Sequence, residues 1–562
     1  MLALFEEHHL LVEADALELI LTSASPLELS REMVAAPAPA SFIITSETVN
    51  RHLEERPPTR AGPAPKMPHG PSAMESGGLL LELPGPAPQP SLGPARAPTE
   101  AARAAALPMA PSVSSDLARR EANDLTTRTP VGSLARRPFQ LIREGFVPPT
   151  GALEPLEGVT GLLRSRFQQL ARVLKRRSDL SSLRPAAEIP QVRGEAAVIG
   201  MVRDVQETPR QKMLILTLED ESGQVRVLIP RDHPAARETY LPDEVLGVRL
   251  FCPKEPGKIP IARAVLRPDV PVARIASRAP RPSKTLFLSD LHLGSKGFLT
   301  DAWNELMGFV RGEGPHGAVA ERLEHVVIAG DLVDGIGIYP NQERDLAIAD
   351  VVEQYAELAR RLKELPSHLN IVAVPGNHDA VCPAEPQPSL PPELSKDLPP
   401  NVHVVANPSV FALEGVLVEA YHGRSFDDLI PQLPKMSYEQ PIPVMKRMLA
   451  MRHLCPTYGL KTPLASLPRD GLVVDPLPDI FVTGHTHTFG AEWWRGVLLL
   501  NASTWQGETD YQRMRNIRPV PGRVTVVDLS QGAVTAVDFL SDHPNVTPTP
   551  AGQGAPGGGA PA

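Results

Sequence analysis

Five short polar strings, each directly behind an apolar run, constrain the fold of this chain more than any other feature of its 562 residues. They lie at 289–292, 330–334, 376–379, 421–423 and 484–487. The apolar runs alternate with helical stretches that are predicted to start near 300 and 343, which is the pattern of an α/β sheet with helices on its faces. Ligands of such a sheet bind outside the carboxyl ends of its strands, so we expect all five strings to meet in one crevice.

The strings are rich in the side chains that bind metal ions without thiolates. They contain Asp290, His292, Asp331, Asn377, His378, His422, His485 and His487. Two divalent ions about 3.5–4 Å apart hold a phosphate, stabilise the attacking and leaving oxygens, and lower the pKa of a bound water. Aspartate, histidine and asparagine suit manganese, iron or zinc better than calcium or magnesium, which prefer oxygen ligands. We expect two divalent ions, manganese first, with magnesium, iron or zinc as alternatives.

His378 is the candidate proton donor among these residues. It lies between Asn377 and Asp379, where it is predicted to face the leaving group and to be tuned by Asp379. Each string alone is weak evidence, because a lone D-x-H or H-x-H pair is more often a surface or capping pair than a ligand pair. The joint occurrence of five strings, each behind a strand, favours a site.

The two ends of the chain differ in composition from the α/β region. Residues 1–55 have apolar side chains at helical spacing and predict a small helical domain. Residues 56–150 hold many of the 63 prolines and have no sustained hydrophobic period, which predicts a disordered linker. A docking motif within the linker is an alternative that composition alone does not support. Residues 543–562 predict a disordered tail.

Two segments precede the α/β domain, which is predicted over 281–542. Residues 151–185 form an amphipathic helical pattern whose basic side chains either face solvent or contact a phosphate backbone. These basic residues are Arg164, Arg166, Arg172, Lys175, Arg176 and Arg177. Residues 186–280 alternate with period two and predict four or five short strands in an OB-type barrel. Few aromatic residues lie there, which favours docking of a protein over tight binding of a nucleic-acid strand.

Charge and cysteine content exclude several classes of protein. The net charge of −9 argues against binding nucleic acid through a uniformly basic surface. Cys252, Cys382 and Cys455 are widely separated, so neither a disulfide framework nor a thiolate zinc site is indicated. No apolar run reaches the ~18 residues of a membrane span, and the acidic N-terminus does not match a signal peptide. We expect a cytoplasmic protein with no membrane partner.

The strings DLH, GDLVD, GNHD, HG and GHTH, in this order, resemble the five motifs of the calcineurin-like metallophosphoesterases, a superfamily of phosphatases and nucleases. Longer strings are similar to the small-subunit family of archaeal family D DNA polymerases. These lie at 421–430, 452–459, 478–490 and 501–522, and the likeness covers about residues 155–540. The resemblance implies a multidomain α/β and β fold, with an OB-type barrel followed by a calcineurin-like metallophosphoesterase α/β sandwich.

The resemblance also implies a role for each candidate ligand. The first metal ion would be held by Asp290, His292 and His487. The second would be held by Asn377, His422 and His485. Asp331 would bridge the two ions and is, with His378, a predicted catalytic residue.

The remaining roles concern the phosphate of the substrate. His378 would be the catalytic acid or the group that steers the phosphate. Arg424 would pair with a phosphate of the DNA strand, or it would form an ion pair with Asp427 or Asp428 instead.

By this resemblance the chain is a small subunit of a replicative DNA polymerase heterodimer and a 3′-to-5′ exodeoxyribonuclease that degrades single-stranded DNA and proofreads. Its expected partners are DNA and a large catalytic subunit, which docks on the barrel and on the outer face of the α/β domain. One alternative is another metallophosphoesterase, such as a phosphomonoesterase. Another is a non-catalytic scaffold, but a scaffold has little physical reason to keep every ligand position filled.

Overall fold

The computed structural model describes residues 11–12, 43–44, 139–149, 155–209, 212–255, 257–509, 512–513, 517–540 and 547–549. Most of the predicted N-terminal helical domain, linker and C-terminal tail therefore lies outside the described residues. Within the tail predicted to be disordered, residues 547–549 instead form a strand that pairs with residues 534–536, so that prediction is wrong there. The chain divides into two compact units, 1–110 and 111–562. In the first unit, β1 (Leu11–Val12) pairs in parallel with β2 (Ile43–Ile44). The helical prediction for residues 1–55 is wrong at these two strands, because short apolar runs form helix or strand equally well.

A seven-stranded sheet begins the α/β domain. Its strands are β9 (Lys284–Leu288), β10 (Leu323–Ala329), β11 (Asn370–Val374), β12 (Val402–Val404), β18 (Arg523–Asp528), β19 (Val534–Asp538) and β20 (Thr547–Thr549), in the order β12-β11-β10-β9-β18-β19-β20. Strands β9 to β12 run parallel, whereas β18, β19 and β20 are antiparallel to their neighbours. Strands β9, β10 and β11 are almost wholly apolar and buried, as parallel strands covered on both faces must be.

A second sheet has six strands. They are β3 (Phe139–Glu144), β13 (Ser409–Leu413), β14 (Val416–Ala420), β15 (Ile480–Thr483), β16 (Phe489–Trp494) and β17 (Val497–Ala502), in the order β16-β17-β15-β14-β13-β3. The two sheets pack face to face, and residues of both, such as Phe287 and Phe411, fill one buried core between them. We call the two sheets and their helices the sandwich.

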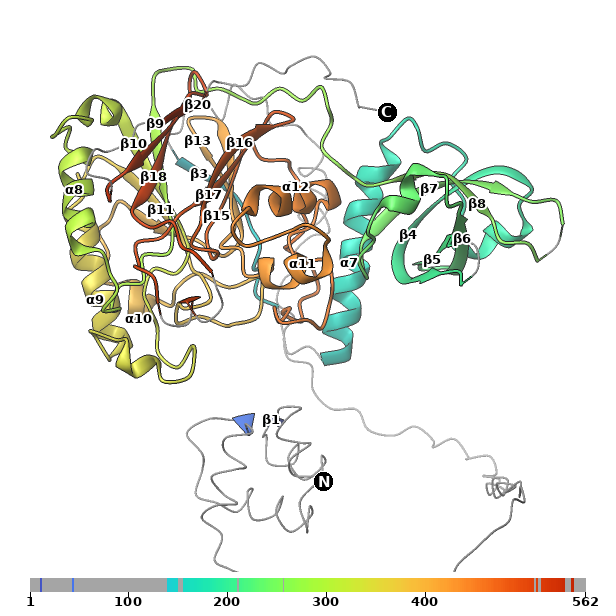
Figure 1. Ribbon diagram of the computed structural model, residues 1–562, viewed down its shortest axis with the longest axis horizontal. Helices are drawn as coiled ribbons and strands as arrows, with labels where there is room; N and C mark the ends of the chain where they lie inside the picture. The colour runs from blue at the N-terminus through green and yellow to red at the C-terminus, as the bar shows by residue number, and fades with distance from the viewer. Residues whose placement is uncertain are drawn as a thin grey trace, which may run out of the picture. The chain divides into compact units, whose positions relative to one another are not determined.

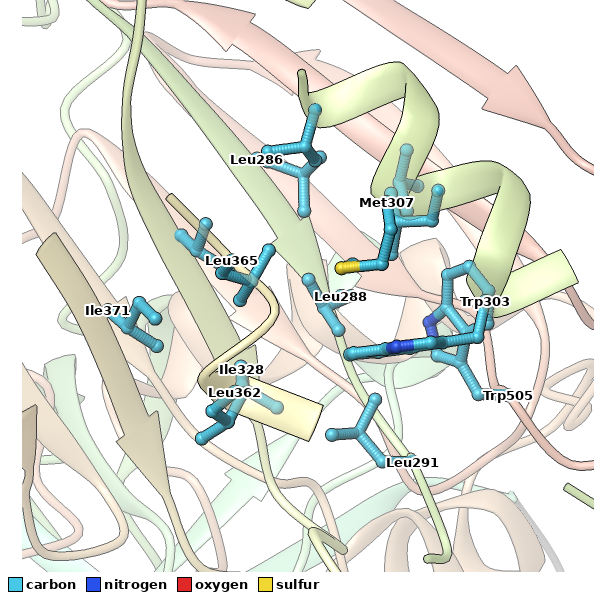
Figure 2. Close-up of a cluster of buried hydrophobic side chains, with 14 of the residues drawn as sticks. Leu286, Leu288, Leu291, Trp303, Met307, Ile328, Leu362, Leu365, Ile371 and Trp505 are labelled. Carbon is cyan, nitrogen blue, oxygen red and sulfur yellow. The ribbon is translucent and has the colours of Figure 1, made fainter. Parts of the chain in front are cut away.

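Helices cover the outer face of each sheet (Figure 1). The first sheet is covered by α8 (Thr300–Val310) and α9 (Val351–Leu362), and the second by α11 (Phe426–Gln432) and α12 (Pro441–Met451). Figure 2 shows Met307 and Trp303 of α8 facing Leu286 and Leu288 of β9. Shorter helices are α10 (Pro392–Ser395), η1 (Ala186–Gln191), η2 (Pro234–Arg237), η3 (Gly317–Ala320) and η4 (Gln342–Arg344).

The start of α9 differs from the sequence prediction. Residues near 343 form only the short 3-10 helix η4, and α9 begins at Val351. The cap explains this boundary, because the Asp350 side chain accepts hydrogen bonds from the backbone N–H groups of Val352 and Glu353. No helix within the described residues is long and apolar enough to cross a lipid bilayer.

A closed five-stranded barrel precedes the sandwich in the chain. Its strands are β4 (Gly194–Glu207), β5 (Leu214–Asp220), β6 (Gly223–Ile229), β7 (Val245–Cys252) and β8 (Ile261–Leu266), in the order β4-β5-β6-β8-β7. Strand β4 pairs with both β5 and β7, which closes the barrel. The β5–β6 turn lies at Glu221 and Ser222, where Asp220 Oδ1 accepts a 2.8 Å hydrogen bond from the Ser222 N–H.

Helix α7 (Pro155–Lys175) lies within the predicted basic segment. Its buried side chains include Leu162, Leu170 and Leu174. Arg166 lies on the same stripe, at a spacing of four residues, and is also buried. Its Nε donates to Asp470 Oδ2 at 2.7 Å, and its Nη1 donates to the carbonyl of Pro456. Arg166 is therefore not part of an exposed basic face, which corrects the sequence analysis.

Strand β3 corrects the predicted linker. Residues 139–144 were expected to be disordered, but they form the edge strand of the six-stranded sheet and pair antiparallel with β13. Arg143 explains the attachment: its Nη2 lies 3.3 Å from Glu419 Oε1, and its Nη1 donates to the carbonyl of Val473 at 2.8 Å. Glu419 is fully buried, and burial raises its pKa to about 7 although Arg143 opposes the rise.

Replacing Arg143 by methionine is expected to lower the free energy of unfolding of the sandwich by about 3–5 kcal/mol, because Glu419 is then left without its partner. A carboxyl group with a raised pKa is destabilising once ionised, so the loss should be larger at pH 8 than at pH 6. All four tryptophans lie in the sandwich, so tryptophan fluorescence during denaturation with urea reports this loss.

The matched control is Arg164→Met, because the side chain of Arg164 is 64% exposed and lies 3.9 Å from Glu221. This variant should keep the wild-type unfolding midpoint. Equal midpoints for Arg143→Met and the wild type would contradict the assignment of β3 as an anchored strand.

Candidate metal centre

The five polar strings meet at one edge of the sandwich, where the carboxyl ends of strands from both sheets lie together. Asp290 and His292 follow β9, Asp331 follows β10, Asn377 and His378 follow β11, His422 follows β14, and His485 and His487 follow β15. Direct contacts join strings that are far apart in sequence, such as the 3.0 Å approach of His292 Nε2 to His487 Nε2. Because strand ends position the side chains, the site has a rigid frame.

The backbone at this edge is strained. Left-handed φ angles of 48° to 67° occur at Asp290, His292, Asp331, His485 and His487. Such angles are costly for residues with a side chain and persist where the surrounding structure imposes them, which is common at functional sites. Space is equally restricted: a Cβ atom at Gly484 would collide with Asp290 and with Ser289.

The first group of ligand atoms comes from Asp290, His292 and His487. His487 Nε2 lies 3.3 Å from Asp290 Oδ1. His292 Nε2 lies 3.7 Å from Asp331 Oδ2 and 3.0 Å from His487 Nε2. Two imidazole nitrogens that face each other at this distance, beside two carboxylates, form a donor set suited to a divalent cation.

The second group comes from Asp331, Asn377, His422 and His485. His422 Nε2 lies 3.2 Å from Asp331 Oδ2 and 3.0 Å from Asn377 Oδ1. His485 contributes an atom within 4.8 Å of those of Asp331 and His422. Asp331 Oδ2 therefore faces both groups.

The electrostatics of the centre require positive charge. Burial lowers the pKa of His292, but hydrogen bonds to Asp290 and Asp334 outweigh it and raise the pKa to about 10. Burial also lowers the pKa of His422, but the charge of Asp331 outweighs this effect and raises the pKa to about 9. Burial alone would raise the pKa of Asp331, but the surrounding histidines hold it well below its usual value. Protons on His292 and His422 thus balance the buried carboxylates, and divalent ions would replace those protons.

Hydrogen bonds orient two histidines of the centre. His292 Nδ1 lies 3.0 Å from Asp334 Oδ1, and His422 Nδ1 lies 3.0 Å from the carbonyl of Ala329. Each bond directs the Nε2 atom of its ring toward the centre. The sequence analysis did not assign a function to Asp334, although its spacing from Asp331 in the same string gives it a place in the centre.

Replacing Asp334 by asparagine should weaken the binding of manganese by about 10- to 100-fold, because His292 loses the carboxylate that orients it. Isothermal titration calorimetry of the purified chain with Mn²⁺ measures this change. Asp232→Asn is the control, since Asp232 is exposed on the barrel. An unchanged affinity in Asp334→Asn would show that the Asp334 carboxylate does not support the binding of the ion by His292.

His378 has different partners from those predicted. Its Nδ1 lies 2.8 Å from the carbonyl of Asp334, and its backbone N–H donates to Asp331 Oδ1 at 2.8 Å. Burial lowers the pKa of His378 to about 4. Asp379 does not tune the ring as predicted, because its carboxylate accepts hydrogen bonds from the N–H groups of Gly376 and Leu332 and from the hydroxyl of Tyr355.

Arg424 is half-buried and donates from Nη1 to the carbonyl of Pro383 at 2.8 Å. Among the described residues it forms no ion pair with Asp427 or Asp428, so that alternative is wrong. Asp427 Oδ2 instead lies 3.5 Å from His485 Nε2. Asp428 accepts hydrogen bonds from backbone N–H groups at 461 and 462. The pairing of Arg424 with a phosphate stays a prediction.

A further group of possible ligands lies away from this centre, at Glu324, His325 and Glu414. Arg281 Nη2 lies 2.6 Å from Glu324 and 2.6 Å from Glu414. The guanidinium therefore already balances both carboxylates, and we assign this group to an ion pair that stabilises the fold.

Comparison with known proteins finds similarity to subunits of DNA polymerases. The model of the family described as the B subunit of DNA polymerase alpha/epsilon matches residues 285–491. The DNA polymerase II small subunit of Archaeoglobus fulgidus is 41% identical over 365 residues, which are 64% of this chain and 73% of that protein. The DNA polymerase II small subunit of Thermoplasma acidophilum is 33% identical over 70% of this chain and 80% of that protein. That of Methanocaldococcus jannaschii is 37% identical over 67% of this chain and 64% of that protein.

Similar solved structures are more distant. Vacuolar Protein Sorting 29 of Cryptosporidium parvum is 16% identical, with a TM-score of 0.27, and the match covers 48% of this chain and 97% of that one. An archaeal phosphodiesterase is 13% identical, with a TM-score of 0.24, over 45% of this chain and 98% of that one.

Proposed function

Because the chain belongs to the family of DNA polymerase II small subunits, we propose that it acts as the small subunit of a replicative polymerase heterodimer and is itself a 3′-to-5′ exonuclease for single-stranded DNA. The observation that supports a hydrolytic role is the position of Asp331 Oδ2, 3.7 Å from His292 Nε2 and 3.2 Å from His422 Nε2. A carboxylate shared by two sets of ligands suits a two-metal phosphodiesterase.

The ligand sets divide as the resemblance implies. Asp290, His292 and His487 would hold one ion, and Asn377, His422 and His485 the other, with Asp331 between them. When bound, two divalent ions supply an activated water at neutral pH and balance charge on the attacking and leaving oxygens. Manganese is the ion we expect, because the donor set mixes imidazole with oxygen.

His378 and Arg424 are proposed to act on the substrate itself. The bond between His378 Nδ1 and the carbonyl of Asp334 fixes the ring, so Nε2 is the atom that meets the substrate. The lowered pKa leaves Nε2 without a proton near neutral pH, so the ring donates to the leaving 3′ oxygen only after the anionic phosphate raises that pKa and the ring is protonated; otherwise it steers the phosphate. Arg424, in the string 421–430, would pair with a phosphate of the strand.

The barrel is proposed to serve the heterodimer. Its strand order, with β4 paired to both β5 and β7 and β6 parallel to β8, fits an OB-type barrel. The β5–β6 turn is acidic at Asp220 and Glu221, which disfavours a DNA phosphate there. We therefore propose that the large catalytic subunit docks on the barrel and on the outer face of the sandwich. The metal centre would then proofread the DNA that the large subunit makes.

End-labelled oligonucleotides test this function. With Mn²⁺, the purified chain, alone or with its large subunit, should release single labelled nucleotides at once from a 3′-labelled strand. A 5′-labelled strand should shorten stepwise. Internal cuts would indicate an endonuclease, and hydrolysis of p-nitrophenyl phosphate alone would indicate a phosphomonoesterase. No cleavage of any substrate by the heterodimer would favour the non-catalytic scaffold.

A further inference from the structure

A short loop beside the metal centre exposes two isoleucines. It covers residues 335–340 and begins directly after Asp334, whose carboxylate orients His292 and whose carbonyl bonds to His378. The side chains of Ile336 and Ile338 are 50% and 38% exposed. The loop thus places apolar surface beside a polar centre.

The loop is rigidly held. The buried side chain of Gln354 bonds to both sides of Gly335, accepting from its N–H at 2.9 Å and donating to its carbonyl at 3.1 Å. Gln342, also buried, accepts from the N–H of Ile338 at 2.9 Å and donates to the carbonyl of Asp334 at 2.8 Å. Four hydrogen bonds thus fix the backbone while the two isoleucines point to solvent.

The loop packs directly on His378. Gly335 has a φ of +71°, and a Cβ atom there would collide with the carbonyl oxygen of His378. The same Cβ would lie 3.3 Å from Ile338 Cδ1, so the end of the Ile338 side chain lies over this contact. Ile338 therefore lies near the backbone of His378, whose side chain is proposed to meet the leaving oxygen of the substrate, and Ile336 is two residues before Ile338 on the same loop.

We propose that Ile336 and Ile338 form an apolar wedge that holds the unstacked base of the 3′-terminal nucleotide. The proposal rests on the proposed exonuclease function. It adds that the exonuclease selects among DNA ends by how easily the terminal base unstacks. Isoleucine is among the side chains that separate stacked bases when inserted between them. Unstacking costs least for a mismatched or single-stranded end, so a wedge at this place favours frayed ends over paired ones.

The test compares DNA ends with and without a terminal base. The double variant Ile336→Ser, Ile338→Ser removes the apolar surface but leaves the ligands and the hydrogen bonds of Gln354 and Gln342 in place. Its substrates are a single-stranded oligonucleotide with a normal 3′ end and the same strand with an abasic 3′ end. The matched control is Ile275→Ser, because Ile275 is 90% exposed and lies outside the five strings.

The expected result is a fall of about tenfold in the ratio of kcat/KM for the normal end to kcat/KM for the abasic end, the size typical of losing one base contact. Ile275→Ser should keep the wild-type ratio. An unchanged ratio in the double variant, with active wild-type enzyme, would overturn the wedge and leave the exonuclease standing. The same unchanged ratio with lower rates on both substrates would overturn it too, and would show that the loop only supports the metal centre.

The failure of the proposed function has a separate signature. Bis(p-nitrophenyl) phosphate is a phosphodiester without a base, and its hydrolysis reports the metal centre alone. If the wild-type heterodimer hydrolyses this diester but releases no nucleotide from DNA, both the exonuclease and the wedge are wrong.

Discussion

Replacing Asp331 by asparagine is expected to lower the rate of phosphodiester hydrolysis by about 10³-fold or more. Asp331 Oδ2 faces both ligand groups, at 3.7 Å from His292 Nε2 and 3.2 Å from His422 Nε2, so the substitution removes the charge that the two groups share. Bound ions supply several kcal/mol of transition-state stabilisation, and each 1.36 kcal/mol is about tenfold in rate. Asparagine keeps the shape of the side chain, so the sandwich should fold normally.

The measurement is the release of nucleotides from a 3′-labelled strand over a titration of Mn²⁺, together with the number of ions bound per chain. Asp232→Asn, on the exposed surface of the barrel, is the control for a lost carboxylate. The variant should bind fewer ions than the wild type at every concentration. A rate within tenfold of the wild type, with two ions bound, would mean that Asp331 does not bridge them.

The second large effect is expected at His378. Replacing it by asparagine should lower kcat by about 10²- to 10⁴-fold, the usual contribution of a positioned proton donor, while the bound ions stay. The ions should stay because the His378 ring bonds to the carbonyl of Asp334. The predicted ligands, such as His292 and His487, instead face one another across the centre. Asparagine keeps an amide donor at this position.

Metal content decides between two roles for His378, because its ring also lies close enough to His292 and Asp331 to be a ligand. A proton donor or phosphate-steering group should leave the Mn²⁺ stoichiometry at the wild-type value. A loss of one ion in His378→Asn would instead make His378 a ligand and contradict its assigned role on the leaving group. Tyr458→Phe is the control for folding, because Tyr458 is exposed and outside the centre.

The sequence predicted the convergence of the five strings better than it predicted the long-range contacts of β3 and α7, for a physical reason. A candidate ligand such as Asp290 is placed by the strand directly before it, β9, and strands are visible as short apolar runs. The ends of parallel strands share one edge of a sheet, so the convergence of distant strings such as 289–292 and 484–487 follows from topology alone.

Long-range contacts were not visible in the sequence. Strand β3 is held by the ion pair of Arg143 with Glu419, and α7 is held by that of Arg166 with Asp470. Each pair joins residues far apart in the chain. A local sequence pattern predicts that an arginine is exposed, because the distant carboxylate that binds it is not part of the pattern. The orientation of Asp379 away from His378 has a similar cause, because the backbone N–H groups that bind its carboxylate are brought there by the fold.

The most direct test of a shared two-metal centre is anomalous diffraction from crystals of the chain grown with Mn²⁺. Two peaks about 3.5–4 Å apart are predicted at the edge of the sandwich, one on each side of Asp331. One peak should lie beside His292 and the other beside His422. A single peak at this edge, or manganese only at the Glu324–His325–Glu414 group, would contradict the account.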